Sequence, residues 1–303
     1  MRTSRRVLIL LTSVAAAAAG LTAAASAPAA ADTPLVGWAT QGGGTTGGGS
    51  VPATTVSSAS ALTSALSSGS AAVIRVSGTI SCSGMLRVTS NKTVIGNSGA
   101  TISGCGFNVS QASNVIIRNL NFRNWGDDGI NVQYSTRVYI DHNSFSNGGD
   151  GALDIKRSSD YITVSWNRFF DHDKTMLLGH SDSNASEDRG RLRVTYHHNW
   201  FDGTNQRHPR VRFGNPVHVF NNYYGSVGSY GVASTQEAGV LVEGNYFENT
   251  DDPFHLGEGS SPPAAWWPAT TTSSTPAAAR AAAASGRSRT RTRSTAPPAS
   301  SRS

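Results

Sequence analysis

The sequence predicts an all-β protein, a right-handed single-stranded parallel β-helix in which the chain winds into a solenoid of stacked coils. Short β-branched runs recur along the chain, and each is followed by an asparagine and then by an aromatic residue. The aromatic residues lie 23, 24, 32, 23 and 23 positions apart, and the asparagines keep the same step. A repeat of this length with about three short strands is typical of one β-helix coil.

The repeat also places two kinds of side chain in register. Because coils stack, we expect an internal column of aromatic rings and a hydrogen-bonded ladder of asparagine amides at one turn. Five asparagines in register make isolated turn residues a poor explanation. The two sets are Phe122, Phe145, Phe169, Phe201, Tyr224 and Phe247, and Asn143, Asn167, Asn199, Asn222 and Asn245.

The first 31 residues have the features of a secretion signal. Arg2, Arg5 and Arg6 make a positively charged start, an apolar run begins at Val7, and small residues up to Ala31 suit a cleavage site. No other stretch is apolar enough to span a membrane. We therefore expect a signal peptide over residues 1–31 and an exported, extracellular protein without a membrane anchor.

The elements of the body follow in order from residue 32. Residues 32–50 are polar and glycine-rich and predict an irregular lead-in. Ala59 to Leu66 predicts a short helix that covers the open end of the solenoid, because Leu62 and Leu66 lie four residues apart. Strands are expected within residues 72–78, 92–97, 114–122, 137–145, 161–169, 191–201, 217–224 and 240–247.

Two features interrupt the regular pattern. The interval of 32 residues holds about nine extra residues, and these predict a loop that leaves the solenoid. Cys82 and Cys105 are 23 residues apart, one coil. In an exported protein they suit a disulfide between neighbouring coils, or simply two small buried side chains.

The net charge of +6 does not describe the body of the protein. Nine of the 25 basic residues lie in the signal or after Pro262, so 16 remain against 19 acidic residues. A nucleic-acid partner inferred from the high isoelectric point would therefore rest on the wrong segment. We expect one monomeric solenoid domain over residues 32–262 that binds neither nucleic acid nor membrane.

Residues 263–303 form a low-complexity tail rich in alanine, serine, threonine and arginine, which predicts disorder. If GC-rich codons are assumed, the DNA that encodes the start of this tail reads GSLVARNNHFVNSG in a shifted reading frame. This peptide has the pattern of a β-strand followed by an asparagine and an aromatic residue. We interpret the tail as the product of a frameshift near codon 262. Loss of a terminal coil and its cap would reduce stability and activity.

Acidic residues gather at two points one coil apart. Asp127 and Asp128 precede a short strand, and Asp150 and Asp154 follow 22 or more residues later. Carboxylates that meet on one face repel each other unless a cation lies among them, and hard oxygen ligands select calcium. A solvated acidic surface is the alternative. Lys174, one coil beyond Asp150, would lie on the same side.

Arg207 and Arg212 follow the long loop within the stretch RHPRVRFG. A row of acids beside a row of bases suits an anionic polymer whose carboxylates are bridged by a cation and held by lysine and arginine. Surface salt bridges are the alternative. The eight histidines have no tight ligand spacing, and we expect most of them to pack or to form hydrogen bonds.

Several stretches carry a family resemblance: VYIDHNSF, DGALDIK, ITVSWNRFFDHDK, RLRVTYHHNWFDGTNQRHPRVRFG and VHVFNNYY. The chain resembles the pectate lyase family of extracellular β-helix enzymes over about residues 35–262. The resemblance implies calcium ligands at Asp128, Asp150 and Asp154, a catalytic Arg207, and substrate-binding Lys174 and Arg212. A further acid seen in some members falls on Gly126 here, so a secondary calcium is not expected. Asp141, in the motif YIDH, is structural in the family.

The resemblance implies a secreted, calcium-dependent pectate lyase that cleaves polygalacturonate by β-elimination to 4,5-unsaturated products. Arg207 would take the C5 proton, although a guanidinium is a poor base, and an alkaline optimum follows. One alternative is a polygalacturonase-type hydrolase, which the adjacent Asp127 and Asp128 favour. Another alternative is an inactive β-helix that only binds polysaccharide, which the altered tail favours.

Overall fold

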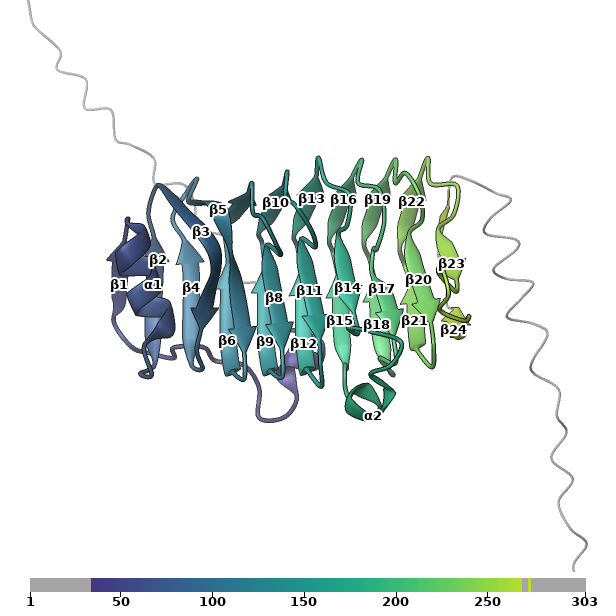
Figure 1. Cartoon of the computed structure of the whole chain (residues 1–303), viewed down its shortest axis with the longest axis horizontal. Helices are drawn as coiled ribbons and strands as arrows, with labels where there is room; N and C mark the ends of the chain where they lie inside the picture. Colours follow the sequence, from purple (N-terminus) through teal and green to yellow (C-terminus); the bar gives the residue numbers. More distant parts are fainter. Residues whose placement is uncertain (1–33, 269–271, 274–303) are drawn as a thin grey trace, which may run out of the picture. The chain divides into compact units, whose positions relative to one another are not determined.

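The computed structural model describes residues 34–268 and 272–273. The predicted signal peptide and most of the predicted tail lie outside these residues. The described chain winds as a right-handed parallel β-helix whose coils stack along one axis (Figure 1), so the predicted fold class is confirmed. No helix in the described part is long and apolar enough to cross a membrane.

One face of the solenoid is a parallel sheet of ten described strands, here called sheet A. Each coil adds one strand, and neighbours pair in register, as Ile162 pairs with Val138 and Val194. The strands are β1 (Ala53–Val56), β2 (Ala72–Val76), β4 (Lys92–Gly96), β6 (Ser113–Arg118), β9 (Thr136–Asp141), β12 (Asp160–Ser165), β15 (Val194–His197), β18 (Val217–Phe220), β21 (Gly239–Glu243) and β24 (Ala265–Pro268).

A second sheet covers the other two faces because the long strand β5 (Thr101–Ser110) pairs with β8 on one face and with β7 on the other. Strand β3 (Thr79–Val88) also pairs with β5. Face B1 contains β8 (Ile130–Gln133), β11 (Leu153–Lys156), β14 (Met176–Leu178), β17 (Arg210–Arg212), β20 (Val232–Thr235) and β23 (Phe254–Leu256). Face B2 contains β7 (Asn121–Arg123), β10 (Ser144–Ser146), β13 (Arg168–Phe170), β16 (Trp200–Asp202), β19 (Tyr223–Gly225), β22 (Tyr246–Glu248) and β25 (Thr272–Ser273).

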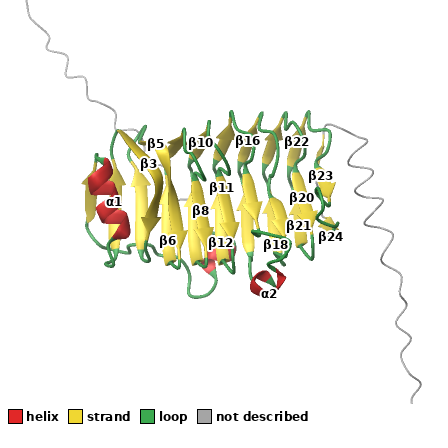
Figure 2. Cartoon of the chain, viewed as in Figure 1, coloured by secondary structure: helices red, strands yellow, loops and turns green. Residues whose placement is uncertain are grey.

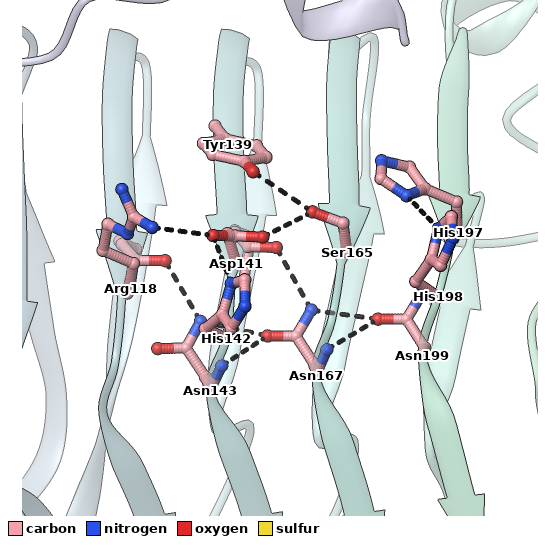
Figure 3. Close-up of polar contacts among 12 residues, drawn as sticks. Arg118, Tyr139, Asp141, His142, Asn143, Ser165, Asn167, His197, His198 and Asn199 are labelled. Atoms are coloured by element: carbon pink, nitrogen blue, oxygen red, sulfur yellow. Dashed lines mark hydrogen bonds and ion pairs between the residues drawn. The ribbon is translucent and has the colours of Figure 1, made fainter. Parts of the chain in front are cut away.

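The predicted internal columns are both present. The six aromatic rings are buried, and successive ring centroids lie 4.1 to 5.3 Å apart. The asparagine amides form a ladder in which each Nδ2 donates to the Oδ1 of the next coil at 2.9 to 3.1 Å, as Figure 3 shows for Asn143, Asn167 and Asn199. The ladder satisfies polar groups that the coil would otherwise leave buried and unpaired.

The N-terminal end of the solenoid carries the predicted helical cap (Figure 2). Helix α1 (Ala59–Ser67) begins where the Ser58 side chain accepts a hydrogen bond from the Ala61 amide at 3.3 Å. Leu62 and Leu66 are fully buried against the open coil. The disulfide, left open by the sequence, forms between Cys82 on β3 and Cys105 on β5.

The lead-in is held against the outer surface of sheet A. It contains a short 3-10 helix, η1 (Trp38–Thr40), whose Trp38 amide donates to Thr195 Oγ1 and whose Ala39 amide donates to Thr163 Oγ1, both at 3.1 Å. Gly37 has a φ of 81°, and a Cβ there would lie 2.7 Å from the Thr195 side chain. Glycine in this segment therefore permits close approach of the backbone to the sheet.

Two short strands fall in the segment that the sequence assigns to the tail. β24 pairs with β21, and β25 pairs with β22, so backbone pairing continues past residue 262. Residues 269–271 and 274–303 lie outside the described part, and the frameshift stays a prediction. The predicted long loop is present between β14 and β15, and it contains α2 (Ala185–Asp188).

Candidate active site

Charged residues stand at the turns that lead into successive strands of face B1. Asp128 precedes β8, Asp150 precedes β11, Lys174 precedes β14 and Arg207 precedes β17. Neighbouring strands of a sheet lie about 4.8 Å apart, so the turns form a row along the solenoid axis. Lys174 also pairs with Gln206 in a parallel bridge, which aligns the last two turns.

Three carboxylates meet at the start of this row. Asp127, Asp128 and Asp150 each place one carboxylate oxygen within 4.8 Å of the others. Asp127 is exposed, Asp150 is partly buried and Asp128 is buried, so the cluster is in contact with solvent. A set made only of carboxylate oxygens suits a hard divalent cation such as calcium.

Asp154 lies beside this cluster, on the outer side of β11. The ammonium of Lys156 sits between two acids, 2.8 Å from Asp128 Oδ2 and 2.9 Å from Asp154 Oδ2. The other oxygen of Asp154 accepts a hydrogen bond from the Leu177 amide at 3.1 Å. Lys156 was not predicted, although its spacing of two from Asp154 on a strand places both side chains on one face.

Gly151 leaves room between the same acids. A Cβ at this position would lie 2.3 Å from Asp154 Oδ1 and 2.8 Å from Asp128 Oδ1. The two oxygens therefore face one small space that any larger residue would fill. This space, together with the carboxylate donor set, fits a calcium ion.

The electrostatics of the acids match a site that binds a cation. Burial raises the pKa of Asp128 to about 7, and repulsion from Asp154 adds to this, whereas Lys156 partly offsets both. Burial alone would lower the pKa of Lys156, but the attraction of Asp154 and Asp128 raises it. Removal of carboxylates from water is unfavourable unless a positive charge compensates it.

Lys174 joins the acids to the next coil. Its Nζ donates to Asp150 Oδ1 at 3.1 Å, and its backbone carbonyl accepts a hydrogen bond from His172 Nε2 at 2.9 Å. Burial lowers the pKa of His172, so its imidazole is neutral near pH 7. The histidine therefore fixes the backbone beneath Lys174.

The segment before β17 places Arg207 in a left-handed backbone conformation with a φ of 66°. Its carbonyl accepts a hydrogen bond from the Met176 amide at 2.7 Å. The next residue, His208, is fully buried and donates from Nδ1 to the Tyr230 carbonyl at 2.7 Å, while Thr204 donates to its Nε2 at 2.8 Å. The backbone of Arg207 is thus held on both sides.

Arg212 points outward from β17 and is held by the long loop. Its Nε donates to Asp182 Oδ1 at 2.6 Å, and its Nη1 donates to the Gly179 carbonyl at 3.2 Å. Ser261 donates to Asp182 at 2.8 Å and accepts from Arg210 Nη2 at 2.9 Å. Asp182 was not predicted, because its partner lies 30 residues away and no local pattern marks it.

A separate polar cluster lies at the ends of the sheet A strands β9, β12 and β15 (Figure 3). Asp141 accepts hydrogen bonds from His142 and Ser165, both at 2.7 Å. Burial would raise the pKa of Asp141, but these two hydrogen bonds lower it. His197 and His198 contact each other through their Nδ1 atoms at 2.9 Å. These histidines form hydrogen bonds and stacks.

Comparisons with known proteins agree with this geometry. The pectate lyase family model matches residues 9–258. A probable pectate lyase B of Aspergillus flavus is 39% identical over 227 residues, which cover 72% of this chain and 69% of the relative. Pectate lyase plyB of Emericella nidulans is 36% identical with the same coverage.

Two solved structures share the fold. A pectate lyase from Bacillus sp. N165 in complex with trigalacturonate superimposes with a TM-score of 0.71 at 29% identity, over 84% of this chain and 97% of that one. The thermostable pectate lyase PL 47 gives a TM-score of 0.67 at 28% identity, over 79% and 84% of the two chains.

Proposed function

Because the chain belongs to the pectate lyase family and is a polysaccharide lyase, we propose that it is secreted and cleaves polygalacturonate in a calcium-dependent β-elimination. The observation that supports this proposal is the row on face B1, in which an acidic cluster is followed directly by Lys174 and the arginines of β17. The row offers a cation site and cationic side chains within reach of one polymer.

We assign the calcium ligands to Asp128, Asp150 and Asp154, and the structure adds Asp127 to the acids within reach. When bound, calcium neutralises the uronate carboxylate and so makes the neighbouring C5 proton more acidic. Lys174 and Arg212 bind carboxylates of the polymer and fix its position along the row. Lys156 keeps two of the acids together before the ion binds.

Arg207 is assigned as the base. Its neutral guanidine takes the C5 proton, the electron pair of the C5–H bond forms the C4–C5 double bond, and the C4–O bond breaks. The departing oxygen takes a proton from solvent.

The test is an assay on polygalacturonate with and without a chelator. A lyase produces a 4,5-unsaturated uronate that absorbs ultraviolet light, and the absorbance should grow only when calcium is present. A polygalacturonase would release reducing ends without this absorbance. A chain that binds the polymer but gives neither signal, while a frame-restored chain is active, would show that the altered tail abolishes activity.

A further inference from the structure

The charges of the described chain are divided along the solenoid axis. Residues 34–126 contain five basic residues and no aspartate or glutamate, whereas residues 127–264 contain 18 acidic and 11 basic residues. The first acid after residue 34 is Asp127, in the candidate calcium cluster. The coils on the N-terminal side of this cluster therefore present no carboxylate that would repel an acidic polymer.

One row of outward side chains runs from the acidic cluster into these coils. Asp154 on β11 pairs in register with Asn131 on β8, Asn131 with Asn108 on β5, and Asn108 with Arg87 on β3. These strands follow one another along the solenoid in Figure 1. Three steps of about 4.8 Å place Arg87 about 14 Å from Asp154 along the axis.

The two asparagines form an oriented pair of amides. Asn131 Nδ2 donates to Asn108 Oδ1 at 3.1 Å, and Asn131 Oδ1 is buried with no hydrogen-bond partner among the described residues. The Nδ2 of Asn108 makes no hydrogen bond within the described part either, so it is an available donor. Asn131 thus orients the Asn108 amide, whose Nδ2 suits a hydroxyl or carboxylate group of a sugar chain.

Arg87 ends the row and is free to bind an anion. It is exposed and forms no ion pair or hydrogen bond with any residue that the structure describes. The other basic residues of this region differ: Lys92 is buried and donates to backbone carbonyls, and Arg118 pairs with Asp141. Arg75 and Arg123 are exposed too, but Arg75 lies on sheet A and Arg123 lies on β7 of face B2.

We propose that Asn131, Asn108 and Arg87 form a subsite that runs from the calcium cluster over the three neighbouring strands β8, β5 and β3, and that Arg87 at its far end binds a uronate carboxylate of a long acidic polysaccharide. This inference rests on the proposed function, because the polymer must already follow the row on face B1. The charged groups of that row stand one per coil along the axis, so an extended polymer that contacts them continues over β8, β5 and β3. A short oligomer bound at the acids does not reach Arg87.

The experiment compares KM for trigalacturonate, hexagalacturonate and polygalacturonate in saturating calcium. We expect Arg87→Ala to raise KM for the two longer substrates about twofold to fivefold, the range of one exposed ion pair, and to leave KM for the trimer and kcat unchanged. Arg87→Lys should restore most of the affinity. Asn108→Asp, which adds a carboxylate to the row, should weaken binding of the longer substrates further.

Arg75→Ala is the matched control, since it removes the same charge from an exposed arginine on another face. The subsite would be overturned if KM changed equally in Arg75→Ala and Arg87→Ala. It would also be overturned if Arg87→Ala changed KM equally for the trimer and the hexamer, or left KM for the hexamer unchanged. If the wild-type chain gives no unsaturated product, the proposed function fails separately. In that case the oligomers are not cleaved, and calorimetry measures the affinity of each variant for them. We then expect Arg87→Ala to weaken binding of the hexamer but not of the trimer, and Arg75→Ala to weaken neither.

Discussion

The carboxylate of Asp182 accepts a hydrogen bond from Arg212 Nε at 2.6 Å, and a surface loop thereby sets the direction of a guanidinium on face B1. Burial would raise the pKa of Asp182, but hydrogen bonds from Ser261 and Arg212 lower it, so the carboxylate stays charged. The loop that interrupts the coil period is therefore part of the candidate active site. Ser261 connects the last described coils to it as well.

Replacement of Asp182 tests this relationship. In Asp182→Ala the guanidinium of Arg212 loses its charged partner and its fixed direction, so we expect KM for polygalacturonate to rise about threefold to tenfold, with a smaller change in kcat. Steady-state kinetics measure both values. Glu187→Gln is the control, because Glu187 lies in the same loop and its carboxylate accepts a hydrogen bond from Asn184, not from an arginine. A wild-type KM for Asp182→Ala would contradict the assignment.

Substitution of Arg207 tests the assigned base. Arg207→Lys keeps a positive charge but changes the geometry and the basicity of the group, so we expect kcat to fall about 100-fold or more. The calcium concentration for half-maximal activity should stay the same. Arg189→Lys, which alters an exposed ion pair with Glu237, should have wild-type kinetics. Activity near wild type for Arg207→Lys would remove Arg207 from the mechanism.

The acidic cluster is tested by Asp150→Asn. Loss of one charged oxygen donor should raise the calcium concentration needed for half-maximal activity by at least about tenfold. The matched control is Asp171→Asn, since Asp171 is an exposed acid one coil away and outside the cluster. An unchanged calcium requirement for Asp150→Asn, measured by titration from chelated enzyme, would place the ion elsewhere.

Lys156 is expected to stabilise the protein when calcium is absent. Lys156→Met leaves Asp128 and Asp154 without the ammonium between them, and loss of one partner from such a buried pair costs about 3 kcal/mol. Denaturant unfolding in chelator should show this loss, and added calcium should recover much of it. Arg189→Met, on an exposed ion pair, should unfold like the wild type in both conditions. If Lys156→Met lost the same free energy of unfolding with and without calcium, the calcium site would not include Asp128 and Asp154.

A further prediction concerns stability at acidic pH. Burial lowers the pKa of His208 to about 4, whereas an unfolded histidine has a pKa of about 6.5. Between these values the unfolded chain binds a proton that the folded chain does not, so stability falls as pH falls from about 6.5 to about 4. The expected loss from this group reaches about 3 kcal/mol at the lower end.

Unfolding curves at several pH values measure the effect. His208→Gln keeps a polar side chain that does not titrate, so its free energy of unfolding should depend less steeply on pH over the same window. The comparison of the two slopes cancels contributions from the other titrating groups. Identical slopes for the wild type and His208→Gln would show that His208 does not contribute.

The scaffold was largely predictable from the chain because its signal repeats. Asn199 and Phe201 recur at the same offset in coil after coil, and the structure places both in continuous columns. Of the strands of face B1, only the short strand after Asp128 was indicated, and the others were not assigned. They are only three or four residues long and carry outward polar side chains, so they lack the β-branched runs that marked sheet A.

The candidate site was predictable where it follows the same period. Asp128, Asp150 and Lys174 are spaced one coil apart, and the structure brings Lys174 to 3.1 Å from Asp150. Contacts that cross between segments have no such signal. Ser261 reaches Asp182 over 79 residues through a loop of irregular length, and the local sequence at either end does not indicate this contact.

The sequence by itself determined the coil period, the internal columns, and the acids and bases that share a turn, because stacking turns a spacing of about 23 residues into adjacency. Only the tertiary structure decided which charges compensate one another. Lys156 lies between Asp128 and Asp154, and Asp182 holds Arg212, because side-chain direction and loop path depend on packing across coils. Such contacts are short-range in space but not periodic in the chain, so no spacing predicts them.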